Sequence, residues 1–401
     1  MPFPGEVVLS AMKHYTVIAR APASAAFRFG TSLVMNYNID GVPLYLEMAS
    51  RLIGPEGQWL GDLQVTAQAQ AESIEDAMAL VTRAREMALM VGIAANTHIG
   101  PFEGEIAYET TPGVEEREYF QRFMPADALC YAERAIPCDA AAAVIEAMAH
   151  HPERNRIIRG MSQYALALSY WESGNELLSL SHLFMGVEAL KTAAWRQLVT
   201  QRGCSRDELA VEWGYRPDGR VDVYTYLDRE ARIRLVFKGD QIHHQIAKEV
   251  SDSFEHGFAN GGTLWNKAAS ALRPTAEHLR HCILAMLNLP TDHHEYLIGE
   301  KYSHPRGPAG IDQYFYAKLL APAGTKLSAE GHDHPFCSWE IEVDARRHKV
   351  DGTHEYVHNR KMTAMIGADV RLQPLNEEVF MRGSYSPKSA EELRNDKAPN
   401  T

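Results

Sequence analysis

The sequence has few cysteines, and none of them is closely paired. Its 401 residues contain five: Cys130, Cys138, Cys204, Cys282 and Cys337. The number is odd, no pair is separated by only two residues, and the spacings are wide, so neither a disulfide framework nor a cysteine-based zinc module is indicated. We therefore expect free thiols in a reducing compartment and a cytoplasmic protein.

Long apolar runs are also missing. No run approaches the roughly 18 residues that a membrane-spanning helix needs. Lys13 and His14 interrupt the early apolar residues, and no cleavage-site pattern of a signal peptide follows them. We expect no membrane partner.

Positive charge is in short supply. Forty Lys and Arg stand against 52 Asp and Glu, which gives a formal net charge of −12. Because a general coat on DNA or RNA needs a positive surface, the sequence argues against that class, although a local basic groove could still bind nucleic acid. The phosphate-binding loop, the GxSxG nucleophile elbow and the dinucleotide fingerprint are missing too, so we expect no cofactor.

What remains is an ordinary globular composition, with 45% hydrophobic and 23% charged residues. The length predicts two or three domains. We expect an α+β multidomain chain with an α/β N-terminal domain (1–150), a helical bundle (151–298), a small β-rich C-terminal domain (299–385) and a disordered polar tail (386–401).

The N-terminal part mixes strand and helix patterns. Residues 14–19 and the alternating segment 63–70 predict strands. Ser73 can cap a following helix, with Asp76 three residues later, and Gly92 is a suitable end for that helix. Residues 115–123 and the alanine-rich segment 139–150 predict two more helices.

The middle part carries long helical patterns. Helices are predicted over 156–171, 176–195, 240–258 and 275–289, with a loop that contains some short structure over 200–222 and a break at Gly261 and Gly262. At least four helices should pack as a bundle over 153–296, with Phe184, Val187 and Leu190 in its core. Further on, alternation over 339–344 predicts a strand, and the pair 351–352 (Asp-Gly) predicts a hairpin turn.

Three segments of the middle part are distinctive together. Residues 164–171 (YALALSYW) end a helix in aromatics, residues 178–190 (LSLSHLFMGVEAL) contain Glu188, and residues 254–257 (FEHG) place His256 before Gly257. In these features the region 153–296 resembles the HEPN superfamily, particularly the ApeA-like group of bacterial proteins.

The resemblance implies a role in RNA metabolism, in bacterial defence or stress. Active HEPN proteins are metal-independent ribonucleases with an Arg and, four to six residues later, a His, and they often dimerise through the bundle. The imidazole moves a proton while the guanidinium stabilises charge on the transition state. We therefore expect RNA as a partner and a homodimer formed by the helical domain.

The site itself departs from that pattern. If His256 is the family histidine, Ser251 stands where an Arg is expected, and Asp252 and Glu255 add negative charge that repels phosphate. Lys248, one turn earlier, could substitute for the Arg, but an ammonium does not reproduce a bidentate guanidinium. The resemblance thus implies a degenerate or weak ribonuclease. A non-catalytic helical module that binds a protein or small ligand is the first alternative.

The sequence contains two other candidate sites, an Arg–His pair and an HExxH segment. Arg273 and His278 have the required ribonuclease spacing in another place. His354 and His358 belong to an HExxH sequence, which on a helix would bind zinc and would make the protein a metal-dependent hydrolase. The surrounding alternation predicts a strand instead, on which these two histidines lie about 13 Å apart and cannot share a metal. The clusters 293–295 (HHE) and 332–334 (HDH) are interpreted as exposed loop residues.

Overall fold

The computed structural model describes residues 12–39, 42–53, 59–122, 134–216, 221–256, 261–308, 311–348 and 354–381. The chain is mixed α and β and divides into two compact units, Met1–Pro308 and Ala309–Thr401. Among the described residues, none of the helices combines the length and apolar character that crossing a bilayer requires.

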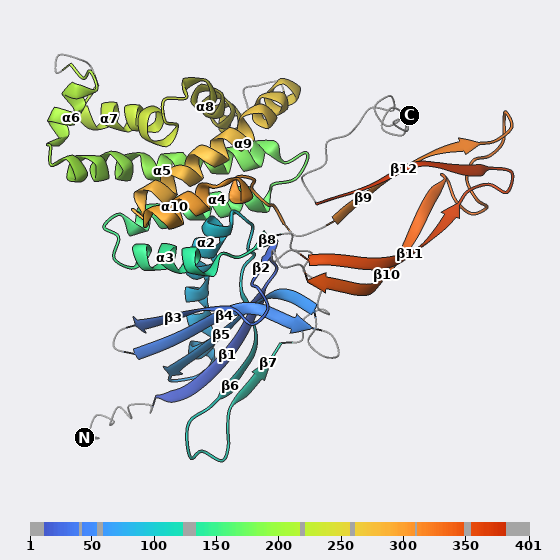
Figure 1. Cartoon of the computed structure of the whole chain (residues 1–401), viewed down its shortest axis with the longest axis horizontal. Helices are drawn as coiled ribbons and strands as arrows, with labels where there is room; N and C mark the ends of the chain where they lie inside the picture. Colours follow the sequence, from blue (N-terminus) through green and yellow to red (C-terminus); the bar gives the residue numbers. More distant parts are fainter. Residues whose placement is uncertain are drawn as a thin grey trace, which may run out of the picture. The chain divides into compact units, whose positions relative to one another are not determined.

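The first unit begins with an antiparallel sheet in the strand order β3-β4-β5-β1-β6-β7 (Figure 1). Alternation along the strands decides its faces: Leu63, Val65 and Ala67 of β5 are buried, whereas Gln64 and Gln68 lie on the opposite face. Both predicted strands, 14–19 and 63–70, are confirmed. The strands are β1 (Lys13–Ala21), β3 (Ser32–Ile39), β4 (Val42–Ile53), β5 (Trp59–Ala71), β6 (Glu103–Glu109) and β7 (Tyr119–Gln121), with β2 (Ala25–Ala26) paired to β8 (Arg134–Ala135) outside the main sheet.

The apolar face of this sheet packs against α1 (Ile74–Ala79), η1 (Leu80–Arg83), α2 (Ala84–Ala95) and α3 (Cys138–Ala149). Ser73 caps α1 as predicted, since its Oγ accepts from the Asp76 amide at 3.2 Å. The predicted end at Gly92 is wrong, because α2 continues until Asn96 adopts a left-handed φ of 50°. The predicted helix over 115–123 is also wrong, since Tyr119–Gln121 pairs with β6 as β7.

The bundle confirms the prediction of at least four packed helices. Phe184, Val187 and Leu190 are buried in its core, at 6%, 0% and 0% exposed. Its helices are α4 (Arg154–Ser169), α5 (Glu176–Arg202), α6 (Arg206–Glu212), α7 (Val223–Ala231), the π-helical turn η2 (Arg232–Val236), α8 (Gln241–His256), α9 (Gly261–Met286), α10 (Thr291–Ile298) and η3 (Glu300–Tyr302).

The short structure expected within the loop over 200–222 is the helix α6, which begins with a reciprocal capping box of Ser205 and Glu208. Gly261 begins α9 rather than breaking a helix, and Pro274 lies inside α9. Packing of α9 against α5 buries Ala268, Ala271, Ala276 and Leu279, and this burial outweighs the poor helix propensity of glycine and proline.

The sheet and the bundle form one compact unit, so the expected boundary near residue 150 does not separate two units. Two buried arginines, one from α9 of the bundle and one from β8, donate to the end of α2. Arg280 of α9 donates to the carbonyls of Ile93 and Ala94, at 2.8 and 3.0 Å, and Arg134 donates to that of Ala95 at 2.9 Å. These carbonyls are the ones that a helix end leaves without partners.

Gly186 allows α5 and α9 to approach closely. A Cβ at this position would lie 2.6 Å from Leu279 Cδ2. We expect Gly186→Ala to lower the free energy of unfolding by about 1–3 kcal/mol, because the Leu279 side chain must leave its rotamer. Urea unfolding measures this, with Thr200→Ala, at an exposed position of the same helix, as the control. A variant as stable as the wild type would mean that the two helices have room to separate.

The second unit consists of two antiparallel pairs, β10 (Phe336–His348) with β11 (His354–Met365) and β9 (Ile311–Leu320) with β12 (Arg371–Met381). The predicted strand over 339–344 is confirmed. His348 pairs with His354, so β10 and β11 form the expected hairpin, although the turn at 351–352 lies outside the described residues. The unit starts after Pro308 rather than after residue 298, and the tail from 386 is outside the described residues as well.

Candidate functional site at the start of helix α8

The residues expected at the family site lie along α8. Ser251 is 1% exposed on its buried face, so its hydroxyl does not reach the surface. Lys248 lies 2.5 Å from Asp252, Nζ to Oδ2, which neutralises the proposed substitute cation. Glu255 and His256 are the last two residues of α8, and their side chains lie outside the described residues. Their catalytic role stays a prediction.

Arg273 and His278 both belong to α9, but they contact different neighbours. Five residues on a helix place two side chains about 140° apart. Arg273 Nη2 lies 3.3 Å from His304 Nε2, whereas His278 Nε2 lies 3.2 Å from Asp240 Oδ2. The structure therefore does not bring this predicted pair together.

His278 belongs instead to a cluster with Asp240 and His243, which we call the imidazole pair site. Asp240 precedes α8 and accepts from the His243 amide at 3.1 Å. Its Oδ2 lies 2.6 Å from His243 Nδ1 and 3.2 Å from His278 Nε2. The three side chains are between 20% and 33% exposed, so solvent reaches them.

Charge at this site is fixed mainly by the hydrogen bonds to Asp240. Partial burial by itself would raise the pKa of this carboxyl, but the donors of His243 and His278 hold that pKa at about 2. The carboxylate is therefore ionised at neutral pH. An ionised carboxylate accepts hydrogen bonds from both rings and thereby orients them.

An aromatic ring separates the imidazole pair site from a partly exposed ion pair. The ring centroid of Phe237 lies 5.3 Å from those of both His244 and His278. His244 is 7% exposed, and its Nε2 has no hydrogen-bond partner among the described residues. Beyond it, Glu188 lies 2.5 Å from Arg232 Nε and accepts from Nη2 at 2.8 Å. Glu188 thus acts as a structural anchor between α5 and η2.

A further imidazole, His281, lies one turn beyond His278 on α9. Burial, followed by the positive charges of Lys238 and Arg280 and by the neighbouring His278 and His294, lowers its pKa to about 4. The folded protein therefore holds this ring neutral at pH values where the unfolded chain protonates it. The unfolded state binds more protons between about pH 6.5 and 4, so stability must fall as the pH falls through this window.

We expect His281→Gln to flatten the decline of stability between about pH 6.5 and 4, because glutamine does not titrate. Urea midpoints measured at several pH values test this, with His150→Gln, an exposed histidine at the end of α3, as the matched control. An unchanged slope in the His281 variant would assign the acid sensitivity to other groups, such as the buried His244, whose pKa burial also lowers.

The geometry of the imidazole pair site suits proton transfer. With Asp240 holding His243 by Nδ1 and His278 by Nε2, the ring nitrogens left for a ligand are His243 Nε2 and His278 Nδ1. Sequence reasoning identified His278 but missed its two partners. The position of Asp240 three residues before His243 could have predicted an N-cap and hence this contact. The contact between Asp240 and His278 could not be predicted, because it depends on how α8 and α9 pack.

The metal-site alternatives receive little support from the structure. Within the described ranges, no group of three or more His, Cys, Asp or Glu is placed to hold a metal ion. His354 and His358 both lie in the extended strand β11, as predicted, and pair with different residues of β10. That they share no zinc stays a prediction. Residues 332–334 lie in a loop, as predicted. The predicted loop over 293–295 is wrong, because these residues lie in α10.

Comparisons with known proteins provide no relative: no family model, no curated protein and no solved structure matches the chain. At the imidazole pair site, two imidazoles converge on one carboxylate from α8 and α9.

Proposed function

We propose that the bundle is a HEPN-like, RNA-directed module of a cytoplasmic protein, and that it cleaves RNA weakly and without metal at the imidazole pair site. The observation that carries this proposal is the shared carboxylate of Asp240, which orients two half-exposed imidazoles. Two imidazoles suffice for cleavage by an internal nucleophile, since one accepts a proton while the other donates one.

The reaction balances as a transesterification. One imidazole takes the proton of the ribose 2′-hydroxyl, whose oxygen attacks the adjacent phosphorus. The bond from phosphorus to the 5′-oxygen breaks, and the second imidazolium gives its proton to that leaving oxygen. The products are a 2′,3′-cyclic phosphate and a free 5′-hydroxyl, and no oxidant, reductant or metal is needed.

Among the described residues, the imidazole pair site has no arginine to stabilise the negative charge that develops on the phosphate in the transition state. Lys238 carries an exposed side chain two residues before Asp240, and its charge acts on His281, one turn from His278. This ammonium is the cation that supports phosphate binding here. A missing guanidinium typically costs about 100- to 1000-fold in rate, so we expect slow turnover.

The test is cleavage of a mixed-sequence RNA by the full chain in EDTA, compared with the double variant His243→Asn and His278→Asn. We expect slow cleavage that yields cyclic phosphate ends and disappears in the double variant. Cleavage that persists in the double variant would refute this site. RNA binding without any cleavage would favour the non-catalytic module.

We also propose that the bundle forms a homodimer, as HEPN-like domains commonly do. The support is apolar surface on neighbouring helices: Leu166 and Tyr170 of α4 and Met185 of α5 are 37%, 37% and 36% exposed. Sedimentation at micromolar concentration should give twice the mass of one chain, and Leu166→Glu should restore the monomer. A monomeric wild type would contradict this proposal.

A further inference from the structure

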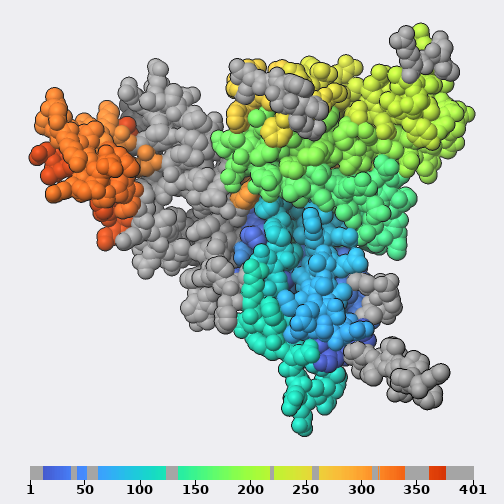
Figure 2. All heavy atoms as spheres, turned by 180° about the vertical axis from the view of Figure 1, so that it is seen from behind, coloured from blue at the N-terminus to red at the C-terminus, as the bar shows by residue number. Residues whose placement is uncertain are grey.

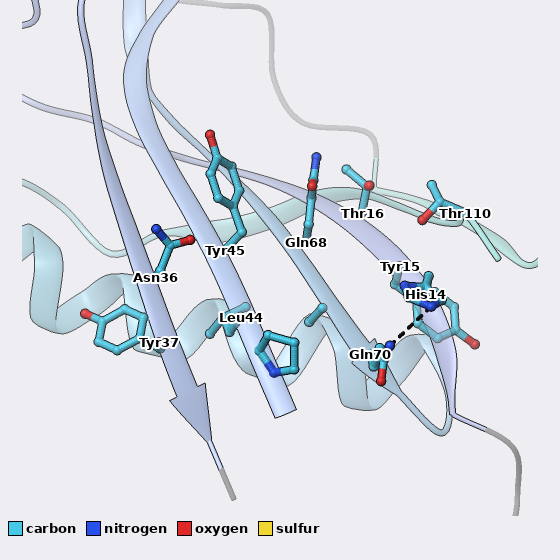
Figure 3. Close-up of a pocket in the computed structure, with 12 residues that line it drawn as sticks. His14, Tyr15, Thr16, Asn36, Tyr37, Leu44, Tyr45, Gln68, Gln70 and Thr110 are labelled. Carbon is cyan, nitrogen blue, oxygen red and sulfur yellow. Dashed lines mark hydrogen bonds between the residues drawn. The ribbon is translucent and has the colours of Figure 1, made fainter. Parts of the chain in front are cut away.

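The face of the sheet that points away from the helices carries a hollow of about 450 Å³ at one end of the strands (Figure 3). Strand register explains how it is lined. Asn36 pairs with Tyr45, Tyr45 with Gln68, and Gln68 with Thr16, so one row of polar side chains crosses β3, β4, β5 and β1. Figure 3 shows these four side chains on the same side of the strands, whereas Leu44 points to the helices.

A second row of side chains lies on the same face of the sheet, two residues further along β1 and β5. Gln70 pairs with His14, and the Thr110 amide donates to the His14 carbonyl at 2.7 Å. The two side chains of the pair also meet, with Gln70 Nε2 3.2 Å from His14 Nε2. The hollow is therefore bordered by amides, hydroxyls and rings from β1, β3, β4 and β5, and by Thr110, which directly follows β6.

The chemistry of the lining is uncharged. Of the described residues that line the hollow, none is Asp, Glu, Lys or Arg. Asn36 and Gln68 are exposed, and neither side chain hydrogen-bonds to another described residue, so each offers an N–H donor and a carbonyl acceptor to a ligand. At the rim, Glu47 accepts the Tyr45 hydroxyl at 3.2 Å, which adds negative charge.

These features select the class of ligand. A phosphate backbone needs cations, whereas the described lining carries no Lys or Arg and the Glu47 carboxylate at the rim would repel phosphate. A polyhydroxyl ligand needs closely spaced groups that both donate and accept, which the two rows supply at the strand spacing of about 5 Å. The rings of Tyr45 and His14 add flat surfaces with a polar edge, suited to the apolar faces of sugar rings.

We propose that this hollow binds a short neutral oligosaccharide, laid across β3, β4, β5 and β1. Its volume falls within the range of about 300–1000 Å³ that is usual for ligand pockets. The binding site is separate from the imidazole pair site and requires no activity there.

Titration calorimetry with the full chain tests the proposal, using maltohexaose, cellohexaose and chitohexaose as probes. We expect at least one of them to bind, and Gln68→Ala to weaken its binding about tenfold by removing two hydrogen bonds. Asn36→Ala should weaken it as well. Gln64→Ala is the matched control, because Gln64 lies on the same face of β5 but outside the hollow and bonds to Thr66 at 3.5 Å.

Each outcome decides the proposal. Binding that both Gln68→Ala and Asn36→Ala reduce, with an unchanged melting temperature, supports it. Failure of all three sugars to bind the wild type overturns it, as does binding that neither variant alters. Binding of oligouridylate in place of the sugars, lost in Gln68→Ala, would make this face a nucleic-acid surface and would also overturn it.

Discussion

Replacing Arg280 with methionine should destabilise the first unit by about 3 kcal/mol or more. Arg280 is 1% exposed and donates to three carbonyls, those of Ile93, Ala94 and Leu297, at 2.8, 3.0 and 2.8 Å. Each hydrogen bond from a charged donor is worth about 1.5–3 kcal/mol, and a buried acceptor left without a partner adds its own cost. Methionine keeps most of the apolar stem, so the loss reports on the guanidinium.

Urea unfolding followed by circular dichroism measures this loss. Arg159→Met, on the exposed side of α4, is the control and should change stability by less than about 0.5 kcal/mol. Arg280→Lys should be nearly as damaging as Arg280→Met, because a single ammonium cannot reach carbonyls from two helices in the planar geometry of a guanidinium. Wild-type stability in Arg280→Met would show that these carbonyls find other donors.

The second large effect concerns catalysis. Removing one imidazole of the imidazole pair site should slow metal-free RNA cleavage by about 100- to 10,000-fold, the usual contribution of a general acid or base. We expect this loss for His278→Asn and for His243→Asn. Asp240→Asn should lose less, because the asparagine side chain fills the same place but accepts less well from the two rings, which are then less firmly oriented.

Three controls separate this prediction from the competing assignments. His150→Asn removes an exposed histidine at the end of α3 and should leave cleavage unchanged. Arg273→Ala should have little effect, since Arg273 contacts His304 rather than His278. Cleavage that survives His278→Asn but is abolished by His256→Ala would move the site to the end of α8 and refute the imidazole pair.

Local sequence patterns predicted several of the helices and strands correctly. The alternation over 63–70 predicted β5, the capping pair Ser73 and Asp76 predicted the start of α1, and the 3.6-residue period placed Phe184, Val187 and Leu190 in the core. These features depend on residues within a few positions of one another. The sequence therefore contains the information without any knowledge of the fold.

Glycine residues did not mark the ends of the helices reliably. Gly92 and Gly261 were expected to interrupt helices, but α2 runs through the first and α9 begins at the second. Propensity differences of about 1 kcal/mol per residue are small beside the burial of a whole helix face. Tertiary packing therefore decided where these helices begin and end.

The candidate sites depended on contacts that no local pattern records. Asp240 meets His278 across 38 positions in sequence, Arg280 meets Ile93 across 187, and the polar rows of the hollow require the register of four strands. By itself the sequence determined the strand over 63–70, the start of α1 and the buried face of α5. Only the tertiary structure decided which polar side chains converge, because that depends on how the buried faces pack together.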